Sequence, residues 1–151
     1  MSGRMWKTLA FSCLILGASS AIAAGAADVI AARQANFKQI GKANKGIMDE
    51  LKNPAPSVPV LQANAKTLAT LAPQVVRWFP AGSGPESGVT TKALPAVWQQ
   101  NPQFKTAAGQ FVNATRNLNA AAASGDVARI RAAYGAVGGT CKGCHDSFRG
   151  R

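Results

Sequence analysis

The sequence predicts an all-α protein, an antiparallel four-helix bundle with one long connection between its second and third helices. Thirty alanines stand against one tyrosine and few β-branched residues, which favours helices over sheets. Hydrophobic residues make up 47% of the 151 residues, enough to bury the core of one domain. Apolar positions also recur at alternating steps of three and four, the spacing of packed helices.

The first 23 residues have the three parts of a secretory signal peptide. Two basic residues precede an apolar run from Leu9 to Gly17, and small residues around Ala23 form a cleavage sequence, with cleavage after Ala26 as the alternative. The apolar run is under half the roughly 20 residues that a membrane span needs, so an N-terminal anchor is the less favoured interpretation. We therefore expect residues 24–151 to form one exported periplasmic domain without a membrane segment.

The first helix of this domain is predicted by a stripe of inward-facing positions. Asp28 can cap its start, and Pro54 after Asn53 ends it. The stripe consists of Ile30, Arg33, Phe37, Ile40, Asn44, Ile47 and Leu51.

A second stripe begins near Ser57, and Pro73 should kink or shorten the helix that carries it. Residues 80–95 contain six glycines and prolines, which indicates the one long connection. The second stripe consists of Leu61, Ala65, Leu68, Ala72, Val75 and Phe79.

The third and fourth helices are separated by a short turn. Asn101 is expected to cap the third helix, with Pro102 in its first turn. Gly125 then provides a stop and Asp126 a new cap. The third stripe is Phe104, Ala108, Phe111, Thr115, Leu118 and Ala122, and the fourth is Val127, Ile130, Tyr134, Val137, Cys141, Cys144 and Phe148.

The last helix contains Cys141-Lys142-Gly143-Cys144-His145, a C-x-x-C-H motif that is typical of covalent c-type haem attachment. On a helix, residues three and four apart share a face, so both thiols can bond the haem vinyl groups while His145 presents its imidazole to the iron. The competing interpretation is a redox dithiol, which usually lies at a helix N-terminus beside a strand. This motif lies near a predicted helix C-terminus, and no strand is expected.

Four segments of the chain carry a resemblance to a known family: residues 137–149, Arg33-Gln34-x-x-Phe37-Lys38, Phe79-Pro80-x-Gly82 and Pro95-Ala96-Val97-Trp98. Together they resemble the cytochrome c′ family, the class II c-type cytochromes, which carry their haem motif near the C-terminus. The resemblance implies a four-helix bundle with one covalently bound haem c per chain.

The resemblance also implies roles for single residues. Phe37 takes the position that faces the distal side of the haem, where cytochromes c′ carry an apolar blocking residue. Phenylalanine cannot ligate iron, and Met48 lies about 16 Å farther along the same helix at 1.5 Å per residue, so we expect a five-coordinate, high-spin iron. Gln34 is expected near a haem propionate, and Arg149 on the proximal side.

Arg33 is unusual in an otherwise apolar stripe, because an unpaired buried charge is costly. A haem propionate would supply a carboxylate partner. The alternative is that the guanidinium group reaches solvent at the start of the helix.

The charge of the chain says little about its partners. The formal net charge is +11, and it falls to +9 once Arg4 and Lys7 leave with the signal peptide. Basic residues are spread over several helices, which favours a solvated surface and leaves an acidic periplasmic redox partner open. No basic stripe with interleaved aromatic residues indicates nucleic-acid binding.

The function that we expect is the binding of nitric oxide and carbon monoxide at the iron of an exported monohaem protein, with electron exchange as a further role. No catalytic residue is assigned, because the single histidine is used by the metal. The alternatives are a periplasmic electron carrier in which gas binding is incidental, and a haem-free dithiol protein. A homodimer stays open.

Overall fold

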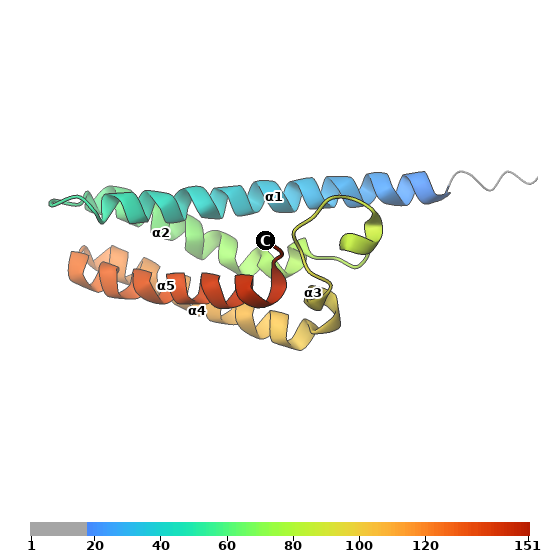
Figure 1. The fold of residues 1–151 in the computed structure, drawn as a ribbon. Coiled ribbons are helices and arrows are strands. Elements are labelled where there is room, and N and C mark those ends of the chain that lie inside the picture. Colours follow the sequence, from blue (N-terminus) through green and yellow to red (C-terminus); the bar gives the residue numbers. More distant parts are fainter. Residues whose placement is uncertain (1–17) are drawn as a thin grey trace, which may run out of the picture.

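The computed structural model describes residues 18–151, with side chains described from residue 25 onward. Four long helices run in alternating directions along a bundle (Figure 1): α1 (Ala18–Glu50), α2 (Val58–Leu71), α4 (Asn101–Ser124) and α5 (Val127–Phe148). This confirms the predicted all-α bundle. Within the described part of the chain, no helix combines the length and hydropathy needed to cross a membrane.

The start of α1 differs from its prediction. Residues 1–17, most of the predicted signal peptide, lie outside the described residues. The helix begins at Ala18 and continues past Asp28 without a break, so the prediction that Asp28 caps its start is wrong for the full chain. The alanine-rich segment before Asp28 has high helix propensity and extends the helix. Cleavage after Ala23 or Ala26 stays a prediction.

The predicted stripes of α1 and α2 form one side of the core. Ile30, Ile47 and Leu61 are almost fully buried, and their neighbours along each stripe are buried or half-buried. Pro73 shortens the second helix as predicted: α2 ends at Leu71, and a 3₁₀ helix, η1 (Ala72–Trp78), continues the chain. Proline has no backbone N–H and clashes with the carbonyl four residues earlier, which an α-helix does not tolerate.

The long connection after η1 contains one 3₁₀ turn, η2 (Pro85–Ser87), and leads into the short α3 (Ala96–Gln99). The prediction that Asn101 caps the third helix is wrong. Its side-chain amide instead donates to the carbonyl of Val97 at 3.4 Å. The reason is that α3 precedes α4 almost directly, and Gln100, whose side chain makes no capping bond, takes the N-cap position.

The predicted turn between α4 and α5 is confirmed. Gly125 has φ +72°, a left-handed conformation that suits glycine, and its N–H donates to the carbonyl of Ala122 at 3.0 Å. Asp126 caps α5 by accepting hydrogen bonds from the backbone N–H groups of Ala128 and Arg129 at 2.9 and 3.1 Å. These bonds satisfy two of the donors that a helix start leaves free.

The Asp126 cap gives a first testable prediction. Asp126→Ala should lower the free energy of unfolding by about 1 kcal/mol, because two N–H groups lose their acceptor. Asp126→Asn keeps an acceptor at this position and is the matched control. Urea denaturation of both variants measures the difference, and an Asp126→Ala variant as stable as Asp126→Asn would contradict the assigned cap.

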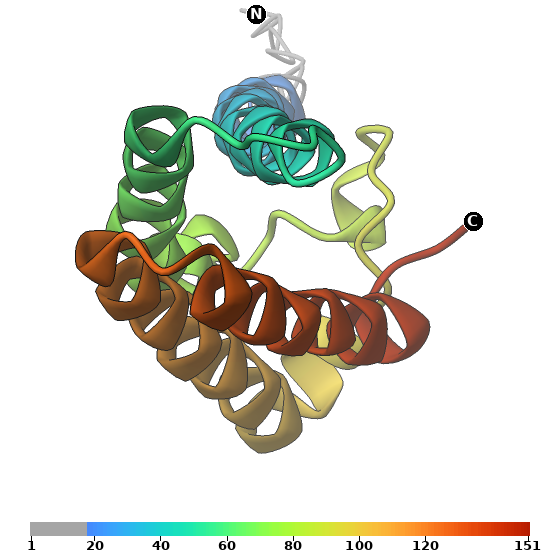
Figure 2. The same cartoon turned by 90° about the vertical axis from the view of Figure 1, so that its left-hand side faces the viewer.

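The helices pack in a chain of neighbours: α1 on α2, α2 on α4, and α4 on α5. Figure 2 shows this arrangement from one end of the bundle, with the connection of residues 79–95 on the side where the C-terminus lies. The backbones of α1 and α5 share little packing. The side chains between α1 and α5 therefore determine which group can be bound between these two helices.

Candidate haem-binding site

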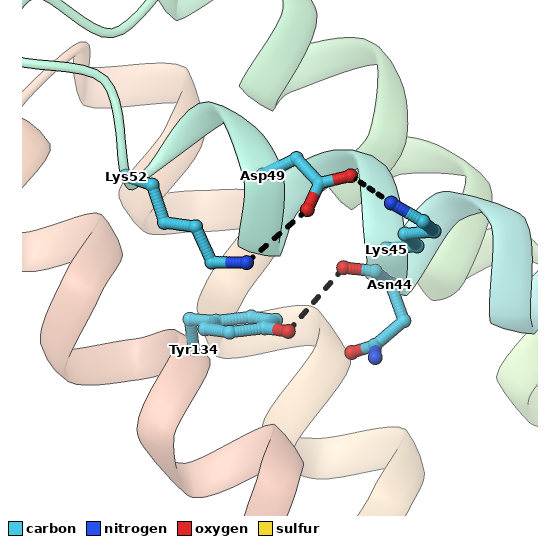
Figure 3. A network of polar contacts seen from close by, with 5 residues as sticks. All are labelled: Asn44, Lys45, Asp49, Lys52 and Tyr134. Atoms are coloured by element: carbon cyan, nitrogen blue, oxygen red, sulfur yellow. Dashed lines mark hydrogen bonds and ion pairs between the residues drawn. The ribbon is translucent and has the colours of Figure 1, made fainter.

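One hydrogen bond fixes the relative height of the antiparallel helices α1 and α5. The hydroxyl group of Tyr134 on α5 donates to the backbone carbonyl of Asn44 on α1 at 3.3 Å (Figure 3). Phe37 lies seven residues before Asn44, and Cys141 lies seven residues after Tyr134. At 1.5 Å per residue, each is about 10 Å from this bond, in the same direction along the bundle. The C-x-x-C-H motif therefore lies at the level of Phe37.

The two thiols of the motif point toward the protein interior. Cys141 and Cys144 are free, half-buried and packed against the hydrophobic core. Burial raises the pKa of both thiols, and the Cys141 sulfur raises that of Cys144 further. A redox-active C-x-x-C pair needs the opposite, a pKa lowered at a helix N-terminus, whereas this pair lies in the last two turns of α5. The geometry disfavours a redox dithiol.

His145 lies at the exposed edge of the same helix. Partial desolvation, together with the nearby Arg149 cation, lowers the pKa of His145, while Asp146 opposes that shift. The lowered pKa favours the neutral form of the imidazole, which is the form that binds a metal. A surface hollow of about 410 Å³ is lined by Lys92, His145, Asp146, Arg149, Gly150 and Arg151. Arg149 therefore lies beside His145, and its proximal role stays a prediction.

The residues that follow the motif are hydrogen-bonded to the long connection. Leu94 N–H donates to the carbonyl of Phe148 at 3.0 Å, and Gly150 N–H donates to the carbonyl of Lys92 at 2.8 Å. Ala93 and Arg149 form an isolated antiparallel bridge between these two bonds. No pattern in the sequence predicts this contact, because a bridge of one residue pair has no periodicity.

Phe37 is half-buried and packs edge-on against other aromatic rings. Its ring centroid lies 5.2 Å from that of Trp78 and 6.1 Å from that of Phe79. Phe79 contacts Phe104 at 5.0 Å, and Phe104 contacts Phe148 at 5.4 Å. Such edge-on pairs add to the stability gained from burial. Because Phe148 follows Cys144 by one turn, this aromatic cluster connects Phe37 on α1 to the motif on α5.

Trp98 also belongs to the aromatic cluster. Its ring packs on Phe79 at 6.1 Å, and its indole N–H donates to the carbonyls of Phe79 and Pro80 at 3.2 and 3.1 Å. These contacts give Trp98 a packing role. Met48 is exposed on α1 and does not pack into the core.

Arg33 is 4% exposed, so the alternative that its guanidinium reaches solvent is wrong. Its two terminal nitrogens make four hydrogen bonds to the segment from Trp78 to Thr91, at 2.9 to 3.3 Å. The group also lies 4.5 Å from the ring centroid of Phe79. Sequence reasoning missed the acceptors in Ser83 and Thr91, since loop residues carry no periodic signal.

These bonds use four of the five N–H donors of Arg33 and leave the Nε–H. Contact with a haem propionate therefore stays a prediction for that one donor. Gln34 is exposed beside Arg33 on α1, and its contact with a propionate also stays a prediction.

The donor set fits a c-type haem. Two uncharged, unpaired thiols three residues apart can each form a thioether bond, and a neutral imidazole follows them directly. The apolar and aromatic side chains at the same level of the bundle suit a flat, largely apolar ring.

Comparison with known proteins agrees with this fit. The family described as Cytochrome C′ matches residues 28–149. Cytochrome c′ from Rubrivivax gelatinosus is 38% identical over 123 residues, covering 81% of this chain and 94% of the relative. Cytochrome c′ from Rhodopseudomonas palustris is 36% identical over 142 residues, covering 91% of each chain.

Solved structures give the same result. The structure of Rubrivivax gelatinosus cytochrome c′ matches with a TM-score of 0.75 and 37% identity, covering 82% of this chain and 96% of that one. A nitric oxide complex of a variant of cytochrome c prime from Alcaligenes xylosoxidans matches with a TM-score of 0.74 and 30% identity, covering 82% and 95%. The chain therefore belongs to the cytochrome c′ family of haem proteins.

Proposed function

We propose that this chain is an exported, periplasmic monohaem cytochrome that binds nitric oxide and carbon monoxide. Cys141 and Cys144 hold one haem c through two thioether bonds, and His145 is the axial ligand. Phe37 covers the distal side, so the iron is five-coordinate and high-spin. The carrying observation is the position of Phe37, a non-ligating side chain held by aromatic contacts at the level of the motif.

When bound, the haem supplies an iron with one open coordination position, and the protein decides which ligands reach it. The Phe37 ring excludes water and must move before a diatomic ligand binds. The residues one helical turn away are Arg33, whose terminal N–H groups are all bonded to the connection, and Gly41, which has no side chain. Dioxygen gains most from a distal hydrogen-bond donor and should bind poorly, whereas nitric oxide needs none.

Nitric oxide binding by relatives supports the proposal. Several of the solved relatives are nitric oxide complexes of cytochrome c prime from Alcaligenes xylosoxidans. Another solved relative is described as a cytochrome c′ with an unusual ligand-controlled dimer dissociation. We include a homodimer in the proposal, and sedimentation of the reduced protein with and without carbon monoxide tests it.

The visible spectrum of the purified, reduced protein tests the proposed iron site. A five-coordinate iron should give a broad high-spin spectrum that changes on addition of carbon monoxide or nitric oxide. A sharp low-spin α-band would instead identify a six-coordinate electron carrier. The absence of a Soret band would identify a haem-free protein.

Removing the Phe37 ring should accelerate ligand binding. Phe37→Ala should bind carbon monoxide in the ferrous state about tenfold faster or more, if displacing the ring costs about 1.4 kcal/mol. Flash photolysis or stopped-flow mixing measures this rate. Phe37→Met should give a low-spin spectrum if its sulfur reaches the iron.

Phe111→Ala is the matched control for Phe37→Ala. Phe111 is a buried phenylalanine of α4 that makes none of the ring contacts around Phe37. Its removal opens a cavity in the core but leaves the ring contacts of Phe37 in place, so the rate should stay near the wild-type value. Unchanged carbon monoxide kinetics in Phe37→Ala would place Phe37 away from the iron.

A further inference from the structure

Arg33 holds the chain segment that supports Phe37. One terminal nitrogen donates to the carbonyl of Trp78 at 3.3 Å and to the hydroxyl of Ser83 at 3.0 Å. The other donates to the carbonyl of Ser83 at 2.9 Å and to the hydroxyl of Thr91 at 3.0 Å. A single side chain of α1 thereby fixes both ends of the segment from residue 78 to residue 91.

The two rings that contact Phe37 belong to the start of this segment. Trp78 meets Phe37 edge-on, and its carbonyl accepts from Arg33. Phe79 meets Phe37 at 63°, and its ring lies under the guanidinium group of Arg33. Arg33 precedes Phe37 by one helical turn, so the two side chains are neighbours on the same face of α1.

We infer that Arg33 is a positioning residue: it holds Trp78 and Phe79 against Phe37 and so keeps the Phe37 ring in the position that slows the access of diatomic ligands. This inference rests on the distal role of Phe37 in the proposed function. It assigns Arg33 a task within the protein that is separate from any bond to a haem propionate. Ligand access is then controlled by how firmly the connection is held, as well as by the size of the distal side chain.

The test is a double-mutant cycle on carbon monoxide association to the ferrous holoprotein. Arg33→Met should bind carbon monoxide about threefold faster than wild type, because Phe37 loses its support. In a Phe37→Ala background the same change should have almost no effect, because the supported ring is gone. Arg116→Met, which replaces an exposed arginine of α4, is the matched control and should leave the rate unchanged.

A second readout does not depend on ligand binding. Hydrogen–deuterium exchange of the oxidised holoprotein should be faster in residues 78–91 of Arg33→Met, and unchanged in those residues in Arg116→Met. If Arg33→Met does not fold, Thr91→Val removes only one of the four acceptors. It should show a smaller acceleration of carbon monoxide binding, which again disappears in the Phe37→Ala background.

The outcomes separate this inference from the proposal on which it rests. If Phe37→Ala binds carbon monoxide faster while Arg33→Met and Thr91→Val bind at the wild-type rate, the positioning role of Arg33 is overturned and the distal role of Phe37 stands. The inference is also overturned if the rate increases of Arg33→Met and Phe37→Ala multiply in the variant that carries both substitutions, since Arg33 would then act independently of the Phe37 ring. A wild-type rate in Phe37→Ala overturns the distal role and this inference together.

Discussion

Replacing Cys141 and Cys144 together with alanine should abolish the retention of haem on the polypeptide after acid–acetone extraction, whereas the wild-type chain should retain it. Two thioether bonds attach the haem covalently to the chain, and the two cysteine sulfurs that form them lie half-buried on the inner side of α5. Absorbance of the precipitated protein in the Soret region measures the retained haem. Thr140→Ala, the neighbouring residue on α5, is the control and should retain haem fully.

A wild-type protein that releases its haem cleanly would show that the motif is not an attachment site. The double variant should also lose much of its helical structure, because a haem-sized cavity would remain in a bundle whose stripes are rich in alanine. Circular dichroism of the haem-free variant measures this loss. A fully helical variant would show that the helices pack without the cofactor.

The helices were predictable because their burial follows from spacing. The stripe from Ile30 to Leu51 on α1 is buried or half-buried in the structure, and so is the stripe from Val127 to Phe148 on α5. Gly125 and Asp126 marked the turn between α4 and α5 because left-handed backbone and capping each require particular residue types. Periodicity and local turn chemistry are properties of adjacent residues, and the sequence displays both.

The misplaced boundaries have a common cause. Asp28 and Asn101 are both good capping residues, but neither takes the N-cap position of a helix here, because the segment before each is already helical or nearly so. Residue preference at a cap acts only where the chain enters the helix from an extended conformation. Whether the preceding segment is helical therefore decides where the helix begins, and it outweighs the preference of a single capping residue.

The candidate site was predictable only in part. Cys141, Cys144 and His145 follow from a local motif, and Phe37 from the resemblance. The partners of Arg33 lie 45 to 58 residues away in a segment without periodicity, so no spacing rule indicates them. The sequence showed only that a charged residue occupies an otherwise apolar stripe, where an unpaired charge is costly. The structure resolves this conflict with the hydroxyl and carbonyl groups of the connection.

Removing the Arg33 guanidinium should cause a large loss of stability. Arg33→Met should lower the free energy of unfolding by about 3 kcal/mol, because it removes four hydrogen bonds and leaves the carbonyl of the buried Ser83 without its donor. Ser83 is 2% exposed, so water cannot readily replace the lost donors there. Arg33→Lys should lose less, since an ammonium group can still donate to part of this set.

Urea denaturation of the holoprotein, followed by far-ultraviolet circular dichroism, measures the loss. Arg116→Met removes an equal charge and a similar side chain from an exposed position and should change stability by under about 0.5 kcal/mol. If Arg33→Met is as stable as Arg116→Met, the hydrogen bonds of Arg33 contribute no net stability. The guanidinium would then be held in place by its surroundings, whereas a loss near 3 kcal/mol would make Arg33 the residue that holds the connection to α1.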